Sequence, residues 1–140
     1  MAAKTKAELR NQVMYSVYVR NYSEEGTFAA VERDLDRIKA LGTDIIWFMP
    51  IHPVGEKAKK GELGSPYANK DYRAINPEFG TMEDFKSVVN AIHEKGMKCK
   101  FAANRNRGYF ILFIKYSVFS LSTYRKKYRI KLVRKMKLFA

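Results

Sequence analysis

The charge of this 140-residue chain is divided so sharply that only part of it has the composition of one soluble domain. All fourteen Asp and Glu residues precede Lys98, where fourteen Lys and Arg residues balance them, whereas the last forty-three residues, Lys98 to Ala140, carry thirteen basic residues and no acid. Soluble domains normally intersperse both signs over their surface. We therefore predict a polar leader (residues 1–11), a globular segment (12–98) and a basic, aromatic tail (99–140).

Two apolar runs in the globular segment predict buried strands. Val13–Val19 is rich in β-branched and aromatic residues, which suit a pleated sheet. Ile45–Met49 is continuously apolar, as is typical of a parallel strand covered on both faces. A long loop with several Gly and Pro residues follows at 51–80, and a third strand is expected to start at Met97.

Two helices are predicted between these strands. Thr27 is a good N-cap, and Gly42 is the expected stop of the helix that it begins. Thr81 and Asp84 form a weak capping box for a second helix, which Gly96 closes. The first helix has apolar residues three or four positions apart, namely Phe28, Val31, Leu35, Ile38 and Leu41. The order strand, helix, strand, loop, helix predicts the parallel α/β fold class.

The bulk properties exclude some functional classes for the globular segment. The pI of about 9.9 would suggest nucleic acid or an anionic membrane as a partner, but the excess charge lies in the tail, so we predict no specific nucleic acid partner. One cysteine, Cys99, excludes an intrachain disulfide. The polar N-terminus lacks an apolar signal region, and no stretch of about twenty apolar residues occurs, so we expect a cytoplasmic protein without a membrane span.

Four motifs in register resemble glycoside hydrolase family 13, the α-amylase family. Gly42–Pro50 is similar to its second strand, Ser65–Tyr72 to its tyrosine and Asp-Tyr loop, and Ile75–Phe85 to the entry of its second helix. His93–Lys98 is similar to the end of that helix and the lead into the third strand. Each motif alone is weak, but four with family-like spacing are specific.

The resemblance implies the N-terminal portion of a (β/α)8 TIM barrel, with the active site at the carboxyl ends of the strands. Members cleave or transfer α-glucosidic bonds with retention, which requires a nucleophile and an acid/base carboxyl group about 5–5.5 Å apart. In the family these groups lie on the fourth and fifth strands, beyond the part that resembles this chain. The resemblance thus implies an α-glucan or malto-oligosaccharide substrate for the parent enzyme and an inactive fragment here, and it leaves hydrolysis and transfer both open.

The resemblance also assigns candidate substrate-binding residues. Tyr67 matches the aromatic residue that stacks on the sugar at the cleavage subsite, and Asp71 is expected to order the loop beside it. His52, directly after the second strand, is more typical of a satisfied loop residue than of a sugar contact. We predict no catalytic residue, metal or cofactor. The remaining carboxylate pairs lie on predicted helix or loop surfaces, namely Glu24/Glu25, Asp34/Asp36 and Glu83/Asp84.

The chain departs from the family pattern after Lys98. The family continues with an apolar third strand that ends in an Asp-…-Asn-His motif, whereas Cys99–Arg107 has neither that Asp nor that His. We interpret the tail as the product of a reading-frame shift or a foreign segment. Two alternatives stay open: a small basic binding protein for nucleic acid or an anionic membrane that uses the tail, and a split enzyme completed by a partner chain. An incomplete barrel leaves strand edges open, so aggregation or oligomerisation is expected.

Overall fold

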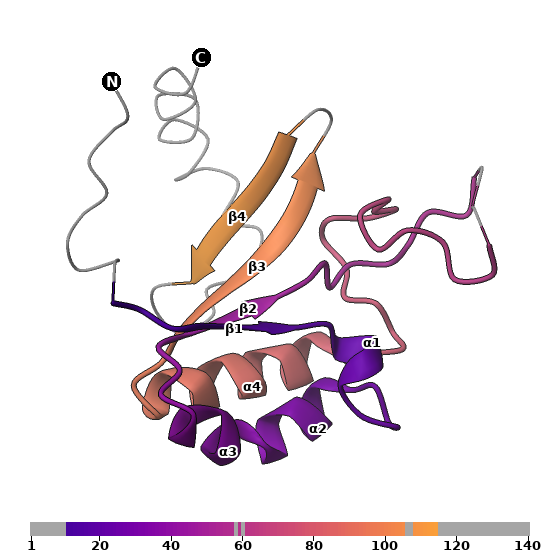
Figure 1. Cartoon of the computed structure of the whole chain (residues 1–140). Coiled ribbons are helices and arrows are strands. Elements are labelled where there is room, and N and C mark those ends of the chain that lie inside the picture. The colour runs from indigo at the N-terminus through magenta and orange to yellow at the C-terminus, as the bar shows by residue number, and fades with distance from the viewer. Residues whose placement is uncertain (1–10, 58, 60, 106–107, 115–140) are drawn as a thin grey trace, which may run out of the picture.

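The computed structural model describes residues 11–57, 59, 61–105 and 108–114, and it contains four strands and four helices within them (Figure 1). In chain order these are β1 (Met14–Val17), α1 (Val19–Tyr22), α2 (Phe28–Arg33), α3 (Leu35–Ala40), β2 (Ile45–Phe48), α4 (Met82–Glu94), β3 (Lys98–Arg105) and β4 (Gly108–Ile114).

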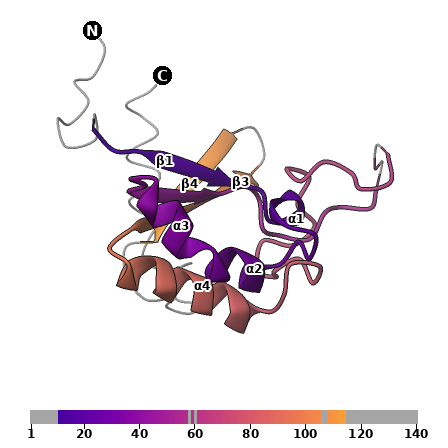
Figure 2. The same ribbon diagram turned by 60° about the horizontal axis from the view of Figure 1, so that its bottom comes forward.

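The strands form one sheet in the order β1-β2-β3-β4. The first three are parallel, with Met14 opposite Ile45 and Ile46 opposite Cys99, and β4 pairs antiparallel with β3. Helices α2, α3 and α4 lie on the same side of this sheet in both views (Figures 1 and 2). Parallel strands joined through helices on one face are the building pattern of the (β/α)8 barrel, so the predicted fold class is confirmed for β1 to β3.

The core lies between the sheet and the helices. Successive strand residues point to opposite faces, and alternate residues of β2 and β3, namely Ile46, Phe48, Cys99 and Phe101, belong to the buried cluster that also contains the apolar faces of the helices. Five phenylalanine rings meet there, with centroids 5.3–6.1 Å apart: Phe28, Phe48, Phe79, Phe85 and Phe101. Edge-to-face ring pairs of this kind add to the stability gained by apolar burial.

The predicted cap of the second helix is confirmed. The Thr81 hydroxyl accepts from the Asp84 backbone N–H at 3.2 Å, and the Asp84 carboxylate accepts from the Thr81 backbone N–H at 2.7 Å. This reciprocal pair satisfies two of the donors that every helix leaves unpaired at its start.

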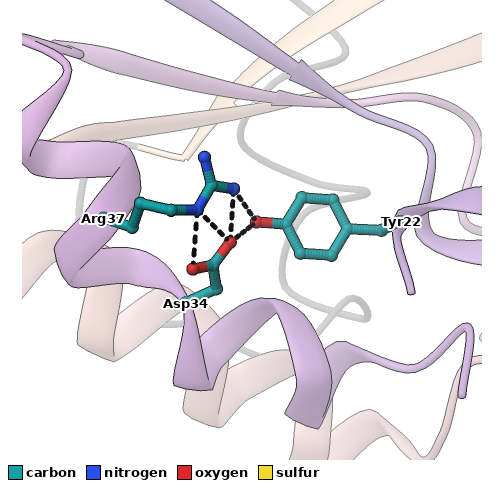
Figure 3. Close-up of polar contacts among 3 residues, drawn as sticks. All are labelled: Tyr22, Asp34 and Arg37. Carbon is teal, nitrogen blue, oxygen red and sulfur yellow. Dashed lines mark hydrogen bonds and ion pairs between the residues drawn. The ribbon is translucent and has the colours of Figure 1, made fainter. Parts of the chain in front are cut away.

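The prediction of one continuous first helix is wrong in one respect. The structure has two helices here, α2 and α3, which meet at Asp34. The backbone N–H of Asp34 donates to Val31 O at 3.1 Å, and the residue has φ −101° and ψ 5°. The break leaves the apolar spacing intact, so periodicity alone does not reveal it. Asp34 then lies where Tyr22 OH and the Arg37 guanidinium both donate to its carboxylate, with Arg37 Nε at 2.9 Å from Oδ1 (Figure 3).

The third strand crosses the predicted boundary at residue 98. It runs to Arg105, because its first half pairs with β2 up to Phe101 and its backbone pairs with β4 from Cys99 to Arg105. The prediction of a third strand that starts near Met97 is therefore confirmed, and this strand extends past the boundary placed at Lys98. The division of the chain into leader, globular segment and tail stays a prediction, and tail residues 115–140 lie outside the described residues.

Candidate functional site

The carboxyl ends of β1, β2 and β3 lie at one end of the sheet because these strands are parallel. The loop at residues 51–80 leaves β2 at this end and extends beyond the sheet before it returns to α4 (Figure 1). Ligand sites of parallel α/β folds lie at this end of the strands. The predicted site residues Tyr67 and Asp71 both belong to this loop.

Tyr67 lies in a turn of the loop, beside the bridge that joins its two limbs. Its backbone N–H donates to Ser65 Oγ at 3.3 Å, and the Ala68 N–H donates to Ser65 O at 3.0 Å. The two limbs of the loop are joined where Gly55 N–H donates to Ala68 O at 2.6 Å and Lys70 N–H donates to Pro53 O at 2.8 Å. The Tyr67 side chain is half-buried, so part of the ring remains accessible in this turn.

Asp71 lies in a second turn of the loop. Its Oδ1 accepts from the Arg73 backbone N–H at 2.8 Å, which is an Asx-turn, and the residue is exposed. Tyr67 and Asp71 are therefore each held by a local turn. This geometry is consistent with the expected loop-ordering role of Asp71, which stays a prediction.

His52 is the buried polar residue at the start of the loop, with 3% of its surface exposed. Its Nδ1 lies 2.9 Å from Ala74 O, and its ring lies against Tyr72 and Phe101, with centroids 5.6 and 6.0 Å away. The expectation of a satisfied loop histidine is thus confirmed by this hydrogen bond. Sequence patterns give no signal for the partners, which are 20 to 49 positions away along the chain.

Burial lowers the pKa of His52 below its ordinary value of 6.5. The hydrogen bond to Ala74 and the negative charge of Asp71 act in the opposite direction, but the desolvation of the charged ring is the larger effect. His52 is therefore neutral at pH 7. Because a carbonyl oxygen only accepts, the proton of the neutral ring is on Nδ1.

The sheet face turned away from the helices carries an unusual pair for a barrel interior. The Lys100 Nζ lies 5.0 Å from the centre of the Trp47 ring, and Lys100 is 6% exposed. Burial lowers the pKa of the Lys100 ammonium. Barrel interiors are dominated by bulky branched apolar residues, so a buried lysine is an unusual residue for this face of β3.

Members of the three candidate carboxylate pairs cap a helix or form hydrogen bonds and ion pairs. Asp84 caps α4, Asp34 belongs to the cluster with Tyr22 and Arg37, and Asp36 pairs with Lys95. Glu25 pairs with Arg33, and that guanidinium lowers the pKa of Glu25. That none of the three pairs does acid/base chemistry stays a prediction.

Comparison with protein families matches residues 11–106 to the catalytic domain of α-amylases. The chain is 37% identical over 102 residues to an α-1,4-glucan:maltose-1-phosphate maltosyltransferase of Pseudomonas aeruginosa, which covers 60% of this chain and 15% of that protein. It is 33% identical over 94 residues to an oligo-1,6-glucosidase of Halalkalibacterium halodurans, which covers 64% of this chain and 16% of that protein.

Solved structures give the same result. An α-amylase from Lactobacillus plantarum superposes with a TM-score of 0.67 at 60% identity, over 69% of this chain and 23% of that one. A maltogenic α-amylase from Thermotoga neapolitana superposes with a TM-score of 0.64 at 30% identity, over 90% of this chain and 36% of that one. The chain thus spans about a sixth of the length of the curated relatives that it matches. Among the residues that the structure describes, no helix has the length and apolarity needed to cross a membrane.

Proposed function

Because the chain belongs to the α-amylase family of glycoside hydrolases, we propose that it supplies the first three strands of an α-amylase-type barrel and part of its sugar-binding wall. The observation that carries the proposal is the loop after β2, which holds Tyr67 and Asp71 in ordered turns at the carboxyl ends of the parallel strands. An aromatic ring suits the C–H face of a pyranose, and a carboxylate suits its hydroxyl groups.

The proposed ligand is an α-glucan or a malto-oligosaccharide. The maltosyltransferase and the oligo-1,6-glucosidase that resemble this chain carry glucan and oligoglucoside substrates in their names. Tyr67 is proposed to stack on the sugar, and Asp71 to fix the loop beside it. The proposal covers both hydrolysis and transfer as the parent reaction. The cytoplasmic location and the association of chains stay predictions.

The chain itself is proposed to be inactive. Retaining cleavage requires two facing carboxyl groups, and the carboxylates of Asp34, Asp36 and Asp84 are engaged in helix caps and ion pairs. We further propose that family patterning is lost after β3, because the match to the α-amylase catalytic domain ends at residue 106.

A chimera tests the sugar-binding role of Tyr67. Residues 11–98 of this chain would replace the corresponding segment of the Lactobacillus plantarum α-amylase, which supplies the remaining strands. We expect the chimera to hydrolyse malto-oligosaccharides, Tyr67→Phe to retain kcat/KM within about threefold, and Tyr67→Ala to lose about tenfold, which corresponds to about 1.4 kcal/mol of lost stacking.

The matched control is Leu63→Ala, which removes a large, exposed apolar side chain from the same loop. Equal losses for Tyr67→Ala and Leu63→Ala, or no loss for either, would contradict a specific sugar contact at Tyr67. The unmodified chain, assayed alone on the same substrates, is expected to release no reducing sugar, and measurable release would refute its proposed inactivity.

A further inference from the structure

The part of the loop that holds Asp71 is attached to the sheet through a buried side chain, His52. Residues 76–79 are held independently, because Asn76 N–H donates to Ile51 O at 2.9 Å and Phe79 is buried in the core. At the other end, Lys70 N–H donates to Pro53 O at 2.8 Å. The stretch between them, residues 71–74, is joined to the end of β2 by the hydrogen bond between His52 and Ala74.

His52 is well suited to this attachment because it combines a directed hydrogen bond with packing on two sides. Its ring contacts Tyr72 from the same stretch, with an interplanar angle of 59°, and Phe101 of β3, with an angle of 75°. His52 thereby links the carboxyl ends of two neighbouring strands to the turn that contains Asp71. With 3% of the residue exposed, water competes little for Nδ1.

We propose that His52 is a positioning residue, which fixes residues 71–74 and hence Asp71 and Tyr72 at the carboxyl ends of β2 and β3. The proposal rests on the proposed function in that the positioned turn belongs to the proposed sugar-binding wall. His52 itself is not proposed to touch sugar, since its ring is covered by Tyr72 and Phe101 and its Nδ1 is committed to Ala74.

The covalent structure of the imidazole suggests a discriminating pair of variants. The amide nitrogen of Asn is separated from Cβ by the same number of bonds as Nδ1, whereas the amide nitrogen of Gln corresponds to Nε2. His52→Asn can therefore still donate to Ala74 O, and His52→Gln cannot do so from the same place. Both variants remove the ring, so loss of aromatic packing is common to them.

Amide hydrogen exchange on the full chain measures the effect directly. The amides of residues 72–75 report on the positioned turn, and those of Val88 and Val89 in α4 serve as an internal reference. We expect His52→Gln to speed exchange at 72–75 about five- to tenfold relative to α4, as follows from the loss of one hydrogen bond. His52→Asn is expected to stay within about twofold of the wild type.

Matched controls are His93→Asn and His93→Gln, which make the same changes at the other histidine, in the last turn of α4. Neither is expected to alter exchange at 72–75. No acceleration in either His52 variant, or a wild type whose 72–75 amides exchange like an unstructured chain, would each overturn the proposal. No sugar takes part in this experiment, so its failure is distinct from failure of the Tyr67 test.

Discussion

At the residue scale, several titratable side chains hold segments of the backbone in place. The cluster in Figure 3 shows this, because Arg37 and Tyr22 both donate to the Asp34 carboxylate and thereby join α1 to the start of α3. The Arg37 guanidinium, followed by Tyr22, lowers the pKa of Asp34, while burial and Asp34 raise the pKa of Tyr22 to about 12. His52 has the same kind of role after β2, with desolvation as the dominant effect on its pKa.

The lowered pKa of His52 predicts a stability that depends on pH. Below pH 6.5 the unfolded histidine takes up a proton that the folded one still excludes, so the unfolded state binds more protons and the free energy of unfolding falls as the pH falls. Asp71 is the charged group that opposes this effect, and the other neighbours are the rings of Tyr72 and Phe101.

Urea unfolding at pH 8, 6.5 and 5 checks this prediction, with His52→Asn as the variant that cannot titrate at this position. The wild type is expected to lose more stability than His52→Asn between pH 6.5 and 5. If the free energy of unfolding had the same pH dependence in both proteins, the buried imidazole would not contribute to that dependence.

At the element scale, patterns formed by neighbouring residues predicted the structure correctly. Features that depend on distant parts of the fold were not predicted. The apolar run of β2 and the Thr81 cap of α4 are properties of neighbouring residues, and both are found where they were expected. The break at Asp34 preserves apolar spacing, and the apolar residues of β3 alternate with lysines. The anchoring role of His52 depends on Ala74 and Phe101, contacts that no local pattern encodes.

The capping box of α4 yields a prediction at this scale. Asp84→Ala removes the carboxylate that accepts from the Thr81 backbone N–H, and we expect a loss of about 1 kcal/mol in the free energy of unfolding. Glu83→Ala is the matched control, because Glu83 is an acidic residue of the same first turn whose ion pair with Lys86 is long, at 3.7 Å, and exposed. Chemical denaturation measures both variants, and equal losses would contradict a specific cap.

At the scale of the whole molecule, one part of the described sheet has the strand arrangement of a barrel and another part does not. Strands β1 to β3 have the parallel order and helix placement of a barrel, whereas β4 returns antiparallel along the edge of β3. In a (β/α)8 barrel that edge takes a parallel strand after a helical crossover. The departure in topology therefore begins after the third strand, and the match to the α-amylase catalytic domain ends at residue 106.

The central claim is that this chain joins the first part of an α-amylase-type barrel to residues from outside the family. The nucleotide sequence across codons 95–107, translated downstream in all three frames, tests the claim most directly. The account predicts that another frame continues with an apolar third strand ending in an Asp-…-Asn-His motif, followed by the carboxylate-bearing strands. The absence of such a strand from every frame would contradict a frame shift and make the basic tail a segment of the protein in its own right.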